Sequence, residues 1–232
     1  MKIDLHVHTS EVSPCGKVPA REMMRMYKEK GYDLVVVTDH LFPSLNTLGQ
    51  DGTCAEKAEK WLEGYRLAKD EGEKIGLKVL LGGEARLCSY GNEDFLVYGF
   101  AEEDAEWFME MLGKVQTVAE MSAEIRAKGF FLAQAHPFRP GLRAQDTSLL
   151  DGVEAFNGNP RHNSSNHLAR AHALGGNLVM LSGSDAHQSV DVARGGMDIP
   201  ARIENNADLL AFLRSGAPRD NAAFEEMAIM TE

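Results

Sequence analysis

Strand-like and helical patterns alternate along almost the whole chain, and this alternation limits the folds open to it. Short apolar runs typical of strands recur at residues 2–8, 34–38, 78–82, 94–99, 130–135, 152–156 and 177–182. Helical patterns lie at residues 19–30, 55–74, 103–112, 115–128, 164–174 and 206–215, followed by what we expect to be a frayed tail. The second run begins Leu-Val-Val-Val and is apolar on both faces, as in a parallel strand covered on each side. This order predicts an α/β fold around a parallel sheet.

Length and composition favour one globular domain, without a membrane span or an extended nucleic-acid surface. At 232 residues, with 25% charged residues, the chain fits a single domain spanning residues 1–232. The net charge of −11 argues against a generic nucleic-acid-binding surface, which would need a basic face, but it does not exclude a nucleotide substrate. No secretory signal is visible, and no apolar run approaches the ~18 residues that cross a bilayer. Three cysteines without CxxC spacing (Cys15, Cys54 and Cys88) suit a reducing compartment, so we expect a cytoplasmic protein.

Five of the eight histidines fall where the expected strands end. They are His6 and His8 in the first run, His40 after the second, His136 after the fifth and His187 after the seventh. Histidine is the commonest metal ligand, and the strand ends of a parallel barrel bring together groups from distant segments. Because side chains alternate along a strand, His6 and His8 share one face and can chelate one cation. The pattern predicts one metal site with several ions at the carboxyl ends of the strands.

Acidic residues accompany these histidines. Asp39 precedes His40, Glu84 follows the third run after two glycines, and Asp185 lies two residues before His187. A buried carboxylate is rare unless it is paired or bound to a metal. Each residue alone has an ordinary explanation, such as a capping Asp or a turn Glu. Their recurrence at successive strand ends favours a shared metal site, in which the position of Glu84 suits a bridging ligand.

These residues resemble the motifs of the PHP (polymerase and histidinol phosphatase) family of metal-dependent phosphoesterases. The motifs follow the family's order from residue 4 to residue 187, and they are Asp4-Leu-His6-Val-His8-Thr9-Ser10, Thr38-Asp39-His40, Glu84, His136-Pro137 and Gly183-Ser184-Asp185-Ala186-His187. No motif is specific alone, but the combination is. The resemblance implies a distorted barrel of seven parallel strands, (β/α)7, with the metal site at their carboxyl ends.

The resemblance also implies a centre of up to three metals. The implied ligands are His6, His8, Glu84 and Asp185 for one metal, Glu84 and His136 for a second, and His40 and His187 for a third.

Two positions depart from the family's commonest pattern. Where many members carry Asp or His after the HxH motif, this chain has Glu11 and Cys15, and either could reach the third metal. We favour Cys15, although a small residue in a tight turn is an equal alternative. Asp94 opens the fourth run, where related sequences often have His, and is predicted to bind the second metal. Its alternative is a strand-edge carboxylate.

The predicted reaction is hydrolysis of a small-molecule phosphomonoester or phosphodiester by a metal-bound hydroxide at a centre of two or three ions. Mixed imidazole and carboxylate ligands suit Zn²⁺, Mn²⁺ or Fe²⁺ better than Mg²⁺ or Ca²⁺. Asp185 or His187 would assist the leaving alkoxide. Arg139, Arg161 and Asn157 follow site strands and are predicted to contact substrate, with solvated or capping roles as the alternative.

Two other functions remain open at this point. Barrels with HxH strand ends also support carbon–nitrogen bond hydrolysis, although the Thr38-Asp39-His40 and Asp185-Ala186-His187 segments fit that class less well. A non-catalytic, metal-binding regulatory domain is the second alternative, which the near-complete ligand set disfavours. The sequence leaves the oligomeric state open.

Overall fold

The computed structural model describes residues 1–49, 51–87 and 91–230, so Cys88 lies outside the described residues. Its strands are β1 (Lys2–Val7), β2 (Leu34–Val37), β3 (His40–Leu41), β4 (Lys78–Arg86), β5 (Asp94–Tyr98), β6 (Phe131–Gln134), β7 (Gly152–Asn157), β8 (Val179–Gly183) and β9 (Met197–Asp198). Its α-helices are α1 (Ala20–Glu29), α2 (Cys54–Ile75), α3 (Ala105–Lys114), α4 (Val118–Ala127), α5 (Asn166–Gly176), α6 (Asn206–Arg214) and α7 (Asn221–Met227). All seven predicted strands and all six predicted helices are present.

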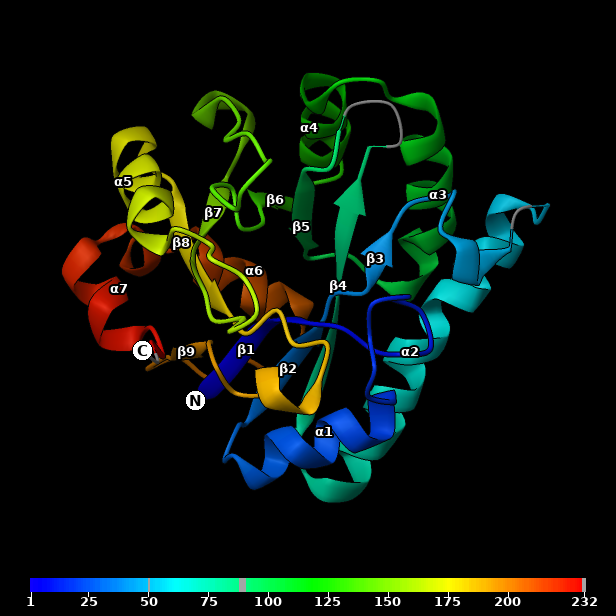
Figure 1. Cartoon of the computed structure of the whole chain (residues 1–232), viewed down its shortest axis with the longest axis horizontal. Coiled ribbons are helices and arrows are strands. Elements are labelled where there is room, and N and C mark those ends of the chain that lie inside the picture. The colour runs from blue at the N-terminus through cyan, green and yellow to red at the C-terminus, as the bar shows by residue number, and fades with distance from the viewer. Residues whose placement is uncertain (50, 88–90, 231–232) are drawn as a thin grey trace.

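The sheet curls into a nearly closed barrel, which confirms the distorted (β/α)7 fold expected from the sequence. Its strands follow the order β8-β7-β6-β5-β4-β2-β1-β9, with β3 beside β4 (Figure 1). The two ends of this order meet beyond β8, where the His8 N–H donates to the Ala186 carbonyl at 3.0 Å. A parallel bridge joins Val7 to Ala186 at the same place. The barrel therefore closes at the segment that carries Asp185 and His187.

One of the seven strands runs against the others, which corrects the prediction of an all-parallel sheet. Strand β5 is antiparallel to both β4 and β6, and the short added strand β9 is antiparallel to β1. Only residues 87–93 join β4 to β5. A parallel neighbour would need a crossover of about a dozen residues or more, so this short connection makes an antiparallel pair. The barrel is distorted at this point.

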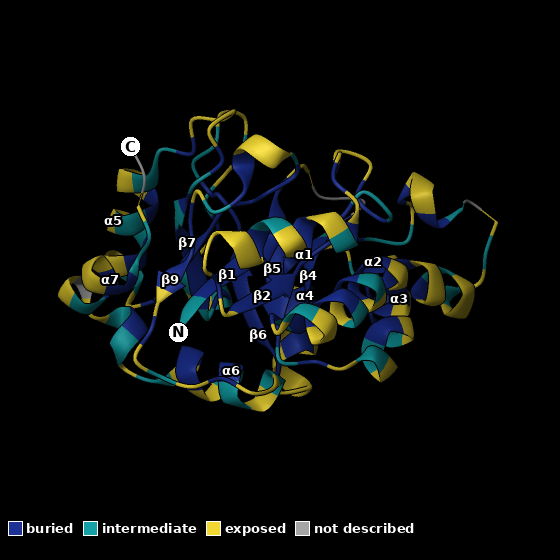
Figure 2. Ribbon diagram, turned by 90° about the horizontal axis from the view of Figure 1, so that it is seen from below, coloured by how far each residue is buried: buried dark blue, intermediate teal, exposed yellow. Residues whose placement is uncertain are grey.

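Helices cover the outside of the barrel and bury one face each. All four residues of β2 are buried, as its apolar run predicted. Helix α1 buries Ala20, Met23, Met24 and Tyr27. Figure 2 shows buried residues in the centre of the molecule and exposed residues on the outer sides of the helices. The core therefore lies between the barrel and its helical layer, and the functional groups gather at one rim.

The tail of the chain is more ordered than the sequence predicted. Helix α7 occupies residues 221–227, where we expected a frayed segment. The Asp220 carboxylate accepts from the Ala223 N–H at 2.8 Å, and the Phe224 side chain is fully buried. The segment is only about two turns long, so its order depends on this cap and on packing more than on helix propensity. The prediction of one domain over residues 1–232 stays a prediction. Within the described residues, every helix is too short or too polar to cross a membrane.

Candidate metal centre

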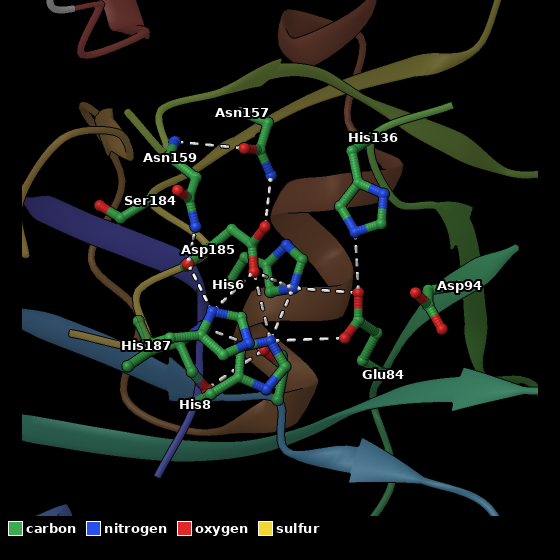
Figure 3. Close-up of polar contacts among 12 residues, drawn as sticks. His6, His8, Glu84, Asp94, His136, Asn157, Asn159, Ser184, Asp185 and His187 are labelled. Carbon is green, nitrogen blue, oxygen red and sulfur yellow. Dashed lines mark hydrogen bonds and ion pairs between the residues drawn. The ribbon is translucent and has the colours of Figure 1, made fainter. Parts of the chain in front are cut away.

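Seven of the predicted metal ligands converge at the rim where the barrel closes, and Figure 3 labels all of them except His40. They come from five separate parts of the chain, and they are His6, His8, His40, Glu84, His136, Asp185 and His187. Six of the seven are buried, and His40 is partly exposed. The Nε2 atoms of His6 and His8 lie only 3.1 Å apart, as expected for two side chains on one face of β1 and its extension.

Glu84 lies at the centre of this cluster. Its Oε1 atom is 3.1 Å from His136 Nε2 and 3.2 Å from His6 Nε2. Its Oε2 atom is 2.8 Å from His40 Nδ1 and 3.4 Å from His8 Nε2. Burial alone would raise the pKa of Glu84, but the surrounding imidazoles hold it well below its ordinary value. The carboxylate thus faces two groups of nitrogen donors, one through each oxygen.

Asp185 faces the same nitrogen atoms from the opposite side of the barrel. Its Oδ1 atom is 3.4 Å from His8 Nε2 and 3.5 Å from His6 Nε2. Its Oδ2 atom accepts from the Arg139 guanidinium at 2.7 Å and from Asn157 Nδ2 at 3.2 Å. Burial would raise the pKa of Asp185, but His6 and its neighbours lower it well below the ordinary value.

Three histidines are held so that Nε2 faces the cluster. His6 Nδ1 is 2.8 Å from Glu154 Oε1, and His187 Nδ1 is 2.9 Å from the Asp185 carbonyl. Both partners can only accept, so each Nδ1 carries the proton and each Nε2 presents a lone pair. His8 Nδ1 lies 3.0 Å from Ser13 Oγ, whose own proton goes to Asp39 at 2.7 Å. The same tautomer follows for His8.

This donor set fits divalent metal ions. Ligand atoms of His6, His136 and Asp185 lie within 4.8 Å of one another, as do those of His8, His40 and His187. Two Nε2 lone pairs cannot bond to each other, so the short approach of His6 to His8 calls for a positive charge between or beside them. Imidazole nitrogen and carboxylate oxygen together suit Zn²⁺, Mn²⁺ or Fe²⁺.

The structure adds one buried carboxylate, Glu154, that the sequence did not place at the site, and it gives Asp39 a supporting position. Glu154, in β7, accepts from His6 Nδ1 and, at 3.0 Å, from the His136 N–H. The available signal was a single Glu in an otherwise apolar strand. Asp39 was noted only beside His40, yet it accepts from Ser13 and from the Thr9 N–H and hydroxyl at 2.7 and 2.6 Å. Both carboxylates orient ligands rather than face the cluster.

Two ligands have an unusual backbone. His136 has φ of 28° and Asp185 has φ of 50°, a region that residues other than glycine rarely adopt. Such conformations cost about 1–3 kcal/mol and persist where surrounding contacts hold them. Here the Glu154 carboxylate holds the His136 N–H, and Asn159 Nδ2 holds the Asp185 carbonyl at 2.9 Å. The strain aims both side chains into the cluster.

The structure separates the two candidates for the third-metal position. Cys15 Sγ lies 3.2 Å from His40 Nε2 and also contacts His187. Burial would raise the pKa of the Cys15 thiol, but hydrogen bonds to these two imidazoles lower it to about 6. Glu11 instead accepts from the Ala20 N–H with both oxygens, at 3.0 Å each, at the start of α1. Cys15 therefore lies at the cluster and Glu11 caps a helix.

Asp94 lies beside Glu84 and His40 but is engaged by an arginine. Ligand atoms of Asp94, Glu84 and His40 fall within 4.8 Å of one another. Burial and the nearby Glu84 charge raise the pKa of Asp94. The Arg86 guanidinium donates to its two oxygens at 2.7 Å each. Asp94 is thus close enough to bind a metal, and it already has a cation.

The three predicted substrate contacts take different positions. Arg139 reaches Asp185 directly and also donates to Asn157 Oδ1 at 3.2 Å. Asn157 donates hydrogen bonds to both Asp185 and Glu154, so its amide holds these two carboxylates in place. Arg161 instead forms an ion pair with fully buried Asp191, at 2.9 Å. That carboxylate also accepts from the His187 N–H at 3.0 Å, so the structure brings Arg139 and Asn157 to the cluster and Arg161 behind it.

A nearly closed α/β barrel with imidazole and carboxylate donors at one rim is an arrangement typical of metal-dependent hydrolases. The chain belongs to the PHP family, whose members are generally of that class. The PHP domain model matches residues 4–188, and the PHP-associated model matches residues 163–218. An uncharacterised protein of Methanocaldococcus jannaschii is 27% identical over 183 residues, which cover 73% of this chain and 89% of that protein.

Solved structures share the fold at low sequence identity. PsfC of Pseudomonas syringae matches with a TM-score of 0.63 and 18% identity, over 90% of this chain and 87% of its own. A two-domain protein of Bacteroides vulgatus containing a predicted PHP-like metal-dependent phosphoesterase matches at 0.55 and 19%, over 82% and 53%. An amidohydrolase of Chromobacterium violaceum matches at 0.54 and 16%, over 96% and 99%. These similarities show that the fold is that of PHP-like phosphoesterases and that an amidohydrolase shares it.

Proposed function

We propose that this protein is a metal-dependent hydrolase of a small-molecule phosphomonoester or phosphodiester, with two or three Zn²⁺, Mn²⁺ or Fe²⁺ ions. The observation that carries the proposal is the convergence of the Nε2 atoms of His6 and His8 on two buried carboxylates, Glu84 and Asp185. A metal-binding histidine requires a proton on its other ring nitrogen and hydrogen bonds that hold the ring in place.

The ligand set divides into two ends that share Glu84. His6, His8, Glu84, His136 and Asp185 would hold cations at one end, and His40, His187 and Cys15 at the other. Divalent cations, when bound, lower the pKa of water and neutralise phosphate charge. Asp94 is a further ligand candidate, subject to its pairing with Arg86.

Residues of the chain supply binding and proton transfer around that centre. The Arg139 guanidinium, 18% exposed, lies against Asp185 and can turn a donor toward a phosphate oxygen. Asn157 keeps Asp185 oriented through its amide. Asp185 and His187 lie where a proton could pass to the leaving alkoxide. Arg161 acts indirectly in this scheme, because it fixes Asp191, which in turn holds the His187 backbone.

The surroundings favour a small substrate. A cavity of about 420 Å³, within the range typical of small-molecule sites, lies beside Asn157 and Asn159, although none of the proposed metal ligands line it. Amide, hydroxyl and imidazole groups line it, among them those of His162, Ser164 and Asn166. The chain's charge of −11 is unfavourable for an extended nucleic-acid partner. Cys15 and Cys54 are free thiols, which supports a reducing compartment such as the cytoplasm.

Parallel assays would separate this reaction from its competitors. Inorganic phosphate release from a panel of phosphomonoesters and phosphodiesters is measured beside amine release from amides, with Zn²⁺, Mn²⁺ or Fe²⁺ supplied. We expect phosphate release only. Amide hydrolysis without phosphate release would make the protein an amidohydrolase, consistent with its Chromobacterium violaceum structural neighbour. Metal binding without either reaction would favour the regulatory alternative.

Asp185→Asn is the sharpest single test of the mechanism. The amide keeps the shape of the side chain but removes the charge that faces His6 and His8, so phosphate release should fall by at least ~100-fold. Asp198→Asn, on a side chain 73% exposed in β9, is the matched control and should leave the rate unchanged. Circular dichroism would show whether both variants keep the fold. Full activity in Asp185→Asn would contradict the mechanism.

A further inference from the structure

The partly exposed Arg86 guanidinium pairs with Asp94, the residue that the family resemblance makes a ligand of a second metal. Arg86 and Asp94 are directly opposite in the β4–β5 antiparallel pair. Arg86 donates through Nε to Asp94 Oδ1 and through a terminal nitrogen to Oδ2, both at 2.7 Å. The Asp94 side chain is 6% exposed and that of Arg86 31%. A two-point pair of this geometry is among the strong hydrogen-bonded contacts in proteins.

This pair uses the Asp94 oxygens that a metal would need. Glu84, two residues before Arg86, lies on the same face of β4. Asp94 belongs to the donor group with Glu84 and His40, yet its two oxygens accept from Arg86. A cation bound to Asp94 would lie beside the positive charge of the guanidinium, so it would be repelled unless it displaced that group. Without Asp94, that position keeps only Glu84 and His136 from the ligands implied for the second metal.

The other two positions keep full donor sets. The Nε2 atoms of His6 and His8 each lie within 3.5 Å of both a Glu84 oxygen and Asp185 Oδ1. His8, His40 and His187 form a second group, which shares His8 with the first, and Cys15 Sγ approaches His40 at 3.2 Å. The Arg86 side chain is also held from outside, with its guanidinium 5.6 Å from the centre of the Phe42 ring. The guanidinium stays charged at every physiological pH.

We propose that Arg86 is a built-in cation that limits the metal centre to two tightly bound ions. One ion takes His6, His8, Glu84 and Asp185, and the other takes His40, His187 and Cys15. Arg86 with Asp94 supplies the positive charge that a further metal would bring at the intervening position. This inference rests on the proposed metal centre but not on its reaction, so metal counting tests it without an activity assay.

The experiment counts zinc per chain by plasma mass spectrometry after saturation and gel filtration. We expect about two ions in the wild type and about three in Arg86→Met, because the freed Asp94 carboxylate then becomes a ligand. The double variant Arg86→Met/Asp94→Asn should return to about two. Arg25→Met is the matched control: it breaks the 2.6 Å contact of Arg25 with Glu71, away from the cluster, and should keep two.

Three ions in the wild type would overturn the inference, and this count does not depend on any variant folding. Two ions in a folded Arg86→Met, or three in the double variant, would also overturn it. A wild type that holds two zinc ions but releases no phosphate would refute the proposed reaction and leave the inference standing. A wild type that holds no zinc would refute the metal centre and the inference together.

Discussion

At the scale of single residues, the ligands were recognisable and their supports were not. The spacing of His6 and His8 within one strand predicts that both can bind one cation, because side-chain alternation is a local property. Glu154 is recognisable in the sequence only as a charged residue in an apolar strand. Its partner His6 lies 148 positions away, so the local pattern does not reveal the contact. For Arg161, the structure adds a partner that the sequence did not predict. Its place after a site strand suggested substrate, whereas the structure pairs it with Asp191, a residue without a sequence signal.

Glu154→Gln tests how much the site depends on this support. Glutamine can present either an oxygen or an N–H to His6 Nδ1, so the favoured tautomer loses its exclusive acceptor. We expect zinc affinity to fall by ~10- to 100-fold, measured by competition with a chromophoric chelator. The exposed substitution Glu110→Gln, in α3, should change nothing. Unaltered affinity in Glu154→Gln would show that His6 needs no fixed partner.

At the scale of elements, close packing of helix α2 holds Thr9 and Asp39, the residues that support His8, in place. A Cβ on Gly64 would lie 2.1 Å from Thr9 Oγ1 and 2.7 Å from an Asp39 oxygen. Those two residues, with Ser13, orient His8. The helix was predictable from its pattern, including the Thr53–Glu56 capping box at its start. The need for glycine at one turn was not, because the atoms that fill that space come from other strands.

Gly64→Ala should therefore destabilise the protein although alanine favours helices. We expect a loss of ~1–3 kcal/mol in the free energy of unfolding, together with weaker zinc binding, because α2 or the Thr9–Asp39 pair must shift. Gly175→Ala in α5 is the matched control, since nothing lies within 4 Å of its new Cβ. That variant should gain ~0.5–1 kcal/mol. Chemical denaturation would measure both, and a stabilised Gly64→Ala would contradict the packing argument.

At the scale of the whole molecule, the candidate metal centre brings together side chains from five separate parts of the chain. The ligands come from the ends of the barrel order, where β1 meets the segment after β8, and from the irregular β4–β5 side. Two buried carboxylates and five imidazoles share this rim. Cations bound there would stabilise the folded state alone, because the unfolded chain does not bring these donors together.

Chelation should accordingly lower thermal stability, and zinc should restore it. For a free metal concentration 100 times the dissociation constant, linkage predicts ~2.7 kcal/mol per site. Differential scanning calorimetry with EDTA, and then with excess Zn²⁺, measures the shift in Tm. Asp185→Asn should show a smaller shift than the wild type. An identical Tm in all metal conditions would mean that the cluster binds no ion strongly.

The sequence by itself determined the alternating α/β architecture, the seven strands of the barrel and the side chains gathered at their ends. These features follow from hydrophobic periodicity and from the residue types at the ends of apolar runs. Both are local properties, because they depend only on residues that are neighbours along the chain. Only the tertiary structure decided that β5 runs antiparallel, that Glu154 and Asp39 orient the histidines and that Arg86 neutralises Asp94. Each of these depends on which strands lie side by side and in what register, a choice made by packing across the whole barrel. The local pattern therefore identifies the candidate metal ligands, and the closed barrel determines which residues hold them in place.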